Sequence, residues 1–109
     1  MENTIEATQG LTTRQVDNLR QGIGTFGAAI EALKEGKKVA RDGWNGKGMW
    51  VKLIEGRVIE SPEESDFKSE DGTVTLCSHI DMFSADKKQV VGWLASQTDM
   101  LAEDWCIVD

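Results

Sequence analysis

The sequence has few of the residues that form metal sites and disulfide frameworks. Its 109 residues include one histidine, two cysteines and no tyrosine. His79 has no cysteine or second histidine at metal-ligand spacing, so we predict no metal site. Cys77 and Cys106 belong to no C-x-x-C motif, which favours two free thiols in a reducing compartment over a disulfide.

Long apolar runs are also missing. No stretch approaches the roughly 18 residues that a membrane-crossing helix needs. Residues 1–10 are polar and contain no hydrophobic core of a secretion signal. We therefore expect a soluble, cytoplasmic protein with no membrane partner.

Catalytic and nucleotide-binding signatures are absent from the sequence as well. It contains no Walker A sequence, no G-x-G-x-x-G and no nucleophile-elbow motif. A serine–histidine–aspartate arrangement could be drawn from Ser84 or Ser96, His79, and Asp81 or Asp99, but no motif supports it. We predict no catalytic residue and no cofactor, and a protein that is not an enzyme.

The sequence also lacks the excess positive charge of nucleic-acid-binding proteins. It has 12 basic and 19 acidic residues, a net charge of −7. DNA and RNA are not expected partners, because neutralising their phosphates requires clustered lysine and arginine. A small anionic ligand is compatible with this charge, because the charge around one pocket can differ from the net charge.

The hydrophobic patterning that is present predicts one α+β domain. An apolar stripe at helical spacing follows the capping residue Thr25 and ends before Gly36, where a left-handed residue is favoured. The spacing of Ser96 and Asp99 is that of a capping box, which predicts a second helix over 97–102. The chain length suits a single domain.

We predict a small, mostly antiparallel β-sheet with two or three short helices over residues 25–109, preceded by an N-terminal extension at 1–24. A further short helix is predicted from residue 12 to the glycines at 22 and 24. Glu55-Gly56 is predicted to close a tight hairpin, and 60–72 is a polar excursion. Period-two patterning and turn residues mark the predicted strands, at 37–41, 49–54, 57–59, 73–76, 79–83, 89–91 and 105–108.

Two stretches of the sequence resemble one family. They are residues 29–48 (AIEALKEGKKVARDGWNGKG) and 93–105 (WLASQTDMLAEDW). Over residues 25–109 the chain resembles the Thoeris anti-defence proteins of the second type, a small phage and prophage family formerly listed as a domain of unknown function. The resemblance implies a homotetramer in the infected bacterial cell that captures cyclic ADP-ribose isomers made by TIR-domain enzymes. Some relatives are also expected to hold cyclic dinucleotides at a separate site.

The sequence departs from this family in three places. Residues 1–24 have no counterpart in the shortest relatives, and the excursion at 60–78 is longer than in compact members. Gly92 stands where proline is common in the family, a change expected to loosen the approach to the second motif.

The glycine-rich turn after residue 41 supplies the first candidate ligand-binding residues. Trp44 offers a flat face on which an adenine can stack. Asn45 has donors and acceptors for a base edge or a ribose hydroxyl, and Arg41 can bind phosphate with both ends of its guanidinium. In the alternative interpretation Trp44 fills the core, Asn45 holds a turn and Arg41 is solvated. Met49, just after the turn, completes this group of candidates.

The predicted helix N-terminus at Ser96, Gln97, Thr98 and Asp99 supplies the second group. Free amides at such a terminus attract phosphate without a basic residue. Because a carboxylate repels phosphate, Asp99 is assigned either to capping or to ribose hydroxyls. Pure capping is the alternative for the whole group.

The tryptophans outside the turn have different expected roles. Trp105 is predicted to pack in the core. Trp93 is predicted to lie in the core, at a subunit interface or in the wall of the ligand site. Trp50 and Ile54 share an exposed strand face that would suit a subunit contact.

These observations favour a non-enzymatic protein that binds and sequesters a cyclic nucleotide immune signal. One alternative is a hydrolase that degrades the same nucleotide. The other is a protein-interaction module that acts on a host factor through its acidic surface.

Overall fold

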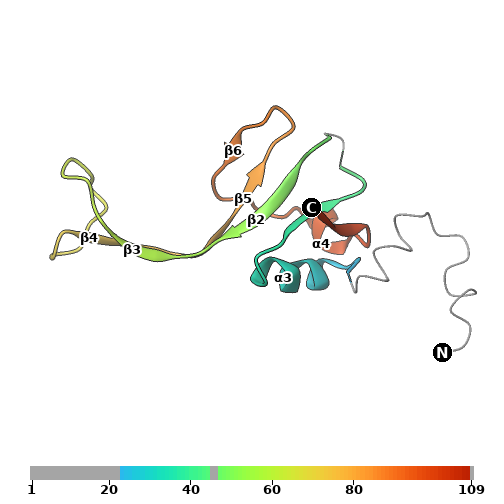
Figure 1. Ribbon diagram of the computed structural model, residues 1–109, viewed down its shortest axis with the longest axis horizontal. Coiled ribbons are helices and arrows are strands. Elements are labelled where there is room, and N and C mark those ends of the chain that lie inside the picture. The colour runs from blue at the N-terminus through green and yellow to red at the C-terminus, as the bar shows by residue number, and fades with distance from the viewer. Residues whose placement is uncertain (1–22, 45–46, 109) are drawn as a thin grey trace, which may run out of the picture.

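The computed structural model describes residues 23–44 and 47–108. In that part of the chain a five-stranded antiparallel sheet has the order β6-β5-β2-β1-β7, and a separate two-stranded sheet pairs β3 with β4 (Figure 1). The α+β class and the mostly antiparallel sheet are confirmed, with two helices among the described residues. The strands are β1 (Lys38–Arg41), β2 (Trp50–Ile54), β3 (Arg57–Glu60), β4 (Thr73–Leu76), β5 (His79–Phe83), β6 (Gln89–Val90) and β7 (Trp105–Val108), and the helices are α3 (Phe26–Lys34) and α4 (Gln97–Leu101).

Helix α3 begins and ends where the sequence predicts. The Thr25 side chain accepts a hydrogen bond from the Ala28 amide at 3.1 Å, and Gly36 follows the helix with a φ of +87°. These contacts satisfy backbone groups that a helix end otherwise leaves unpaired. The short helix predicted from residue 12 to the glycines at 22 and 24 lies largely outside the described residues.

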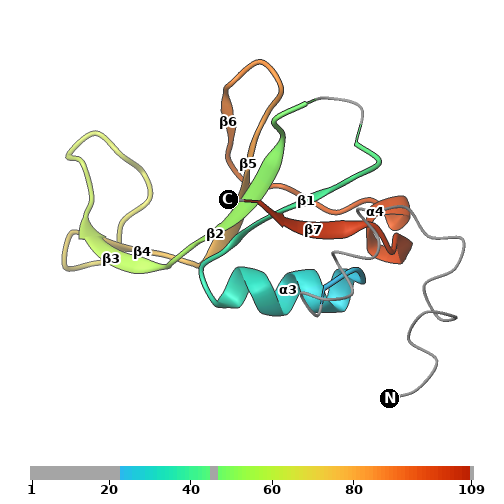
Figure 2. The same cartoon turned by 45° about the vertical axis from the view of Figure 1, so that its right-hand side comes forward.

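The core lies between α3 and one face of the five-stranded sheet (Figure 2). Val39 and Val51 face each other across β1 and β2, and both are fully buried. Leu33 from α3 and Trp105 from β7 close over them. The predicted core position of Trp105 is therefore confirmed. Side chains alternate between the two faces of a strand, so the neighbours of Val39 and Val51, among them Lys38 and Trp50, lie on the opposite face of the sheet.

The predicted hairpin at Glu55-Gly56 is wrong. Strand β2 pairs with β5 and β3 pairs with β4, and the chain continues from β2 into β3 without reversing its direction (Figure 1). A Cβ on Gly56 would lie 2.5 Å from the Leu76 carbonyl oxygen and 2.8 Å from the Ser78 nitrogen. The glycine therefore permits two strands to approach closely and does not form a turn.

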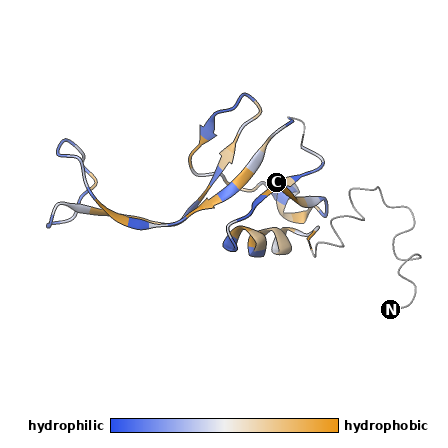
Figure 3. Cartoon of the chain, viewed as in Figure 1, coloured by the Kyte–Doolittle hydropathy of each residue, from blue (hydrophilic) through white to orange (hydrophobic). Residues whose placement is uncertain are grey.

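Strands β3 and β4 form an arm, residues 57–76, that projects from the body of the molecule (Figure 1). The strands of the arm carry apolar residues, whereas the loop that joins them is largely hydrophilic (Figure 3). The polar excursion predicted at 60–72 is this loop. Residues 84–88 form the hairpin turn that joins β5 to β6, which pair antiparallel as neighbouring strands.

No helix among the described residues is long and apolar enough to cross a membrane. Cys77 is exposed and Cys106 is buried, and both are free thiols, as the sequence predicts.

Candidate functional site

Arg41, the last residue of β1, connects three parts of the chain. Its Nε donates to Asp104 Oδ1 at 2.8 Å, and its Nη1 donates to Asp99 Oδ1 at 2.9 Å. All three side chains are at most 20% exposed. The guanidinium therefore joins the end of β1 to α4 and to the segment before β7. This arrangement differs from the solvated Arg41 of the alternative interpretation.

The charges of this network stabilise one another. Hydrogen bonding to Asp104 raises the pKa of Arg41. Burial acts to raise the pKa of Asp99, but hydrogen bonds from Arg41, Trp44 and Ser96 outweigh it and lower that pKa. In the same way, burial at Asp104 is outweighed by bonds from Arg41 and Gly43, and its pKa is also lowered. Both aspartates are ionised at neutral pH, so the two carboxylates together carry one more charge than the arginine that they share.

Gly43 allows the Asp104 carboxylate to approach the turn after β1. The Gly43 amide donates to Asp104 Oδ2 at 2.7 Å. A Cβ at this position would lie 2.7 Å from the same oxygen and 3.2 Å from Arg41 Nη2. A side chain here would push apart the ion pair that holds the turn.

Three tryptophans pack at near-perpendicular angles beside this network. Trp44 lies 5.4 Å from Trp105 and 6.1 Å from Trp93 between ring centroids. Edge-to-face geometry of this kind stabilises aromatic clusters beyond their buried area. The Trp44 indole N–H donates to Asp99 Oδ1 at 3.1 Å, and the Trp105 indole N–H donates to the Asp99 carbonyl at 2.9 Å. Asp99 thus fixes two rings and one guanidinium.

The capping box predicted at the start of α4 is confirmed. Ser96 Oγ accepts from the Asp99 amide at 3.0 Å, and Asp99 Oδ2 accepts from the Ser96 amide at 3.2 Å. One carboxylate therefore caps the helix and also pairs with Arg41. The capping role given to Asp99 as one of two options is the one that its contacts support.

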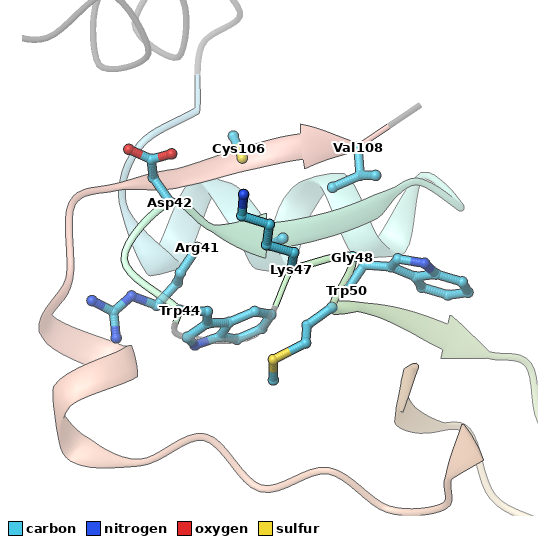
Figure 4. Close-up of a pocket in the computed structure, with 10 residues that line it drawn as sticks. Arg41, Asp42, Trp44, Lys47, Gly48, Trp50, Cys106 and Val108 are labelled. Carbon is cyan, nitrogen blue, oxygen red and sulfur yellow. The ribbon is translucent and has the colours of Figure 1, made fainter. Parts of the chain in front are cut away.

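A pocket of about 450 Å³ opens beside Arg41 on the sheet face opposite α3 (Figure 4). Trp44, Lys47 and Trp50 border this pocket, and Gly48 lies in its wall with a φ of +79°. Lys47 is exposed and has no ion-pair partner within 23–44 and 47–108. The full lining is Ala40, Arg41, Asp42, Trp44, Lys47, Gly48, Met49, Trp50, Cys106 and Val108.

The structure divides the predicted site residues into two groups. Arg41, Trp44 and Met49 line the pocket, and Asp99 supports it from behind through its bonds to Arg41 and Trp44. Four other candidates do not line it. Trp93 packs against the core, and Ser96, Gln97 and Thr98 lie at the exposed start of α4, while Asn45 lies outside the described residues.

Sequence reasoning missed Lys47, Trp50 and Asp104 as parts of this site. Lys47 lies within the family motif at residues 29–48. Its position three residues after Trp44 could have indicated that it belongs to the same site. Trp50 was assigned to a subunit contact, because period-two alternation gives the face of a strand but not what lies at its edge. Nothing in the sequence pairs Asp104 with Arg41, which is 63 residues away.

The serine–histidine–aspartate arrangement considered from the sequence does not assemble among the described residues. His79 Nε2 lies 3.4 Å from Asp81 Oδ1, but the Ser84 hydroxyl bonds within its own turn to Asp86 and to the Lys88 carbonyl. Ser96 caps α4. The described residues also contain no group of three metal-ligating side chains.

Comparison with known proteins identifies the family. The sequence profile of the Thoeris anti-defense 2-like domain matches residues 24–108. The chain belongs to the Thoeris anti-defense 2-like family. A similar protein is "Thoeris anti-defense 2" of Bacillus phage SP01, which is 40% identical over 84 residues, 77% of this chain and 93% of the relative. The resemblance stated from the two motifs is confirmed.

Membership of the Thoeris anti-defense 2-like family assigns the chain a role in anti-defence. The matched residues 24–108 include α3, every strand and α4, and therefore the whole Arg41 network and the pocket. Gly92, the expected departure from the family, has a φ of +84° and donates its amide to Asp81 Oδ1 at 2.9 Å. Proline can neither adopt this φ nor donate this hydrogen bond. The segment before Trp93 is therefore held here by a contact that requires a residue with a free backbone amide.

Proposed function

We propose that this protein acts in anti-defence by binding a cyclic nucleotide signal in the Trp44–Trp50 pocket and withholding it from its receptor. The signal would be a cyclic ADP-ribose isomer made by a TIR-domain enzyme. No chemical change of the ligand is required. The observation that carries the proposal is the meeting of two indoles and one unpaired ammonium group around one pocket.

The contacts of the pocket suit an anionic nucleotide. Trp44 is partly exposed and held by its neighbours, so its indole can stack on a base without first being ordered. The Lys47 ammonium can approach a phosphate. Arg41 already has two carboxylate partners, so its proposed role shifts from binding phosphate directly to fixing the pocket wall.

Affinity is the main demand on a sequestering protein. Holding a signal below nanomolar free concentration requires about −12 kcal/mol of binding free energy. A pocket whose walls are fixed by hydrogen bonds before binding loses little entropy on ligand entry. The Asp99 bonds to Arg41 and Trp44 provide such fixing. The homotetramer implied by the family would add contacts if pockets lie near subunit boundaries.

The test is recovery of an intact ligand. The protein is mixed with a cyclic ADP-ribose isomer, free ligand is removed by filtration, and the retained protein is heated before mass spectrometry. Intact ligand released from the heated protein supports sequestration. A new product mass would indicate a hydrolase, and ligand left in the filtrate would contradict binding of this isomer.

A charge-reversal variant connects the result to the pocket. Lys47→Glu places a carboxylate where the ligand phosphate is expected, and retention should fall at least about tenfold. Lys34→Glu is the matched control, because Lys34 is exposed on α3, across the sheet from the pocket. Equal retention by the two variants would place the ligand elsewhere. A protein partner bound in nucleotide-free extract would instead favour the interaction-module alternative.

A further inference from the structure

The tip of the arm presents one aromatic side chain to solvent. Phe67, in the loop between β3 and β4, is 79% exposed. Its amide donates to Ser65 Oγ at 3.0 Å, and its carbonyl accepts from Ser61 Oγ at 2.9 Å. Both backbone groups of Phe67 are therefore held by side chains of the same loop. An exposed aromatic ring on a fixed backbone has the properties of an interface anchor.

The base of the same loop is also fixed. Asp71 Oδ1 accepts from the Ser69 hydroxyl, the Thr73 hydroxyl and the Thr73 amide at 2.7 to 3.0 Å. The Ser69 and Thr73 bonds lower the pKa of Asp71 to about 2. The Lys68 ammonium donates to the Glu63 carbonyl at 2.9 Å. The tip is thus an ordered structure on a two-stranded ribbon, a form that is only marginally stable without a packing partner.

The tip carries strong negative charge. Residues 60–71 contain six carboxylates and one lysine. No ion pair involves the Glu63, Glu64, Asp66 or Glu70 side chain in the part of the molecule that the structure covers. An apolar pocket with a basic border would complement Phe67 and the carboxylates around it.

A second pocket of the same chain has that character. It measures about 390 Å³ and lies where β2 pairs with β5. Trp50 and Phe83 stack in its wall with ring centroids 5.1 Å apart. The lining is Trp50, Lys52, Ile54, Asp81, Met82, Phe83, Lys87 and Gln89.

The charges at the border of this second pocket are complementary to the tip. Lys52 and Lys87 are exposed, and neither has an ion-pair partner among the residues described. The one carboxylate in the lining, Asp81, is 5% exposed and accepts from Gln89 and Gly92. Lys87 is held at the β5–β6 turn by the hydrogen bond that its backbone amide donates to the Ser84 carbonyl at 2.9 Å.

We propose that the arm tip of one copy inserts Phe67 into the Trp50–Phe83 pocket of a second copy. In both views the arm leads away from β2 and β5, the strands that carry most of this pocket's lining, so we place the contact between two copies (Figures 1 and 2). Each copy offers one tip and one pocket, and a two-fold axis would form both contacts at once. The tip carboxylates of each copy then meet Lys52 and Lys87 of the other. The contact concerns assembly and does not depend on which ligand the first pocket takes.

Disulfide trapping tests the contact in the full-length chain. In a Cys77→Ser background, a protein with Asp66→Cys is mixed with a tagged protein carrying Lys87→Cys. We expect a mixed disulfide dimer to form at least about tenfold faster than with the control Lys34→Cys, which lies on the opposite side of the sheet. Equal trapping of the two positions, or none, would overturn the proposal.

Solution mass gives a second, independent readout. Phe67→Ser should reduce the assembly to a smaller species at the same protein concentration, and Lys52→Glu with Lys87→Glu should do the same. Glu63→Lys with Glu64→Lys in a partner chain should restore assembly with the Lys52→Glu, Lys87→Glu protein. A wild-type monomer, or an unchanged mass for Phe67→Ser, would contradict the proposal. Ligand retention is measured separately, so failure of assembly and failure of binding are distinguishable.

Discussion

Arg41 and Asp104, which are 63 residues apart in the chain, form a hydrogen-bonded ion pair with an Nε–Oδ1 distance of 2.8 Å. The pair joins the last residue of β1 to the segment just before β7, and Asp99 extends it to α4. The first family motif is thus attached to the second through one guanidinium. The stability of the pocket wall depends on this connection.

Arg41→Ala should destabilise the protein strongly. It leaves the partly buried carboxylates of Asp99 and Asp104 without their cation, a change that costs about 3 kcal/mol in comparable settings. Urea unfolding measures the loss. Lys34→Ala, which removes an exposed lysine from α3, should change the unfolding free energy by less than about 0.5 kcal/mol. Similar values for the two variants would show that the ion pair contributes little.

The same carboxylates predict acid sensitivity. Asp99 and Asp104 have lower pKa values in the folded protein than in the unfolded chain. Their contribution to stability is therefore complete above the unfolded value of about 3.9 and is lost as pH falls through the folded values. The unfolding free energy of the wild type should decrease between pH 5 and pH 2. Because Arg41→Ala has lost the interaction already, its decrease should be shallower, and parallel curves would contradict this assignment.

Gly56→Ala should disrupt the junction between arm and body. The added methyl group would meet backbone atoms of Leu76 and Ser78, which cannot move aside without breaking strand pairing. We expect a loss of about 1–3 kcal/mol in the unfolding free energy. Gly27→Ala is the matched control, because Gly27 is an exposed position in α3 with space for a methyl group, and alanine should stabilise the helix by about 0.5–1 kcal/mol. A harmless Gly56→Ala would show that the strands can separate at this point.

Trp44→Phe should weaken ligand retention without unfolding the protein. Phenylalanine keeps a ring in the cluster but loses the bond to Asp99 and part of the stacking area. A cost of about 1 kcal/mol corresponds to about fivefold weaker binding. Titration with a cyclic ADP-ribose isomer, with circular dichroism as the folding control, measures it. Unchanged affinity in a folded variant would assign Trp44 to the core alone.

Local sequence signals predicted most of the elements of this fold. The capping residues Thr25, Ser96 and Asp99 each make the predicted bond, because capping depends only on residues three positions away. The hairpin predicted at Glu55-Gly56, directly after β2, is wrong for a related reason. A glycine after a strand has the same local signal whether it forms a turn or permits a close approach, and only the distant strand β5 decides between them.

The candidate site was predicted in part for the same physical reason. Residues near Trp44 in sequence could be grouped into one turn, and Arg41, Trp44 and Met49 do line one pocket. Their supports, Asp99 and Asp104, come from the other end of the chain. Their carboxylate contacts depend on how β7 pairs with β1. That pairing has no local signature.

Trp50 contributes to the walls of both pockets on the same sheet face. A rotation of its indole would therefore reshape the Trp44–Trp50 pocket, proposed to bind ligand, and the Trp50–Phe83 pocket, proposed to receive a second copy, at the same time. By thermodynamic reciprocity, any factor by which ligand occupancy changes the affinity between copies is the factor by which assembly changes the affinity for ligand. In the proposed scheme this one side chain would link capture of a small molecule to association of copies, and the retention of ligand would then depend on protein concentration.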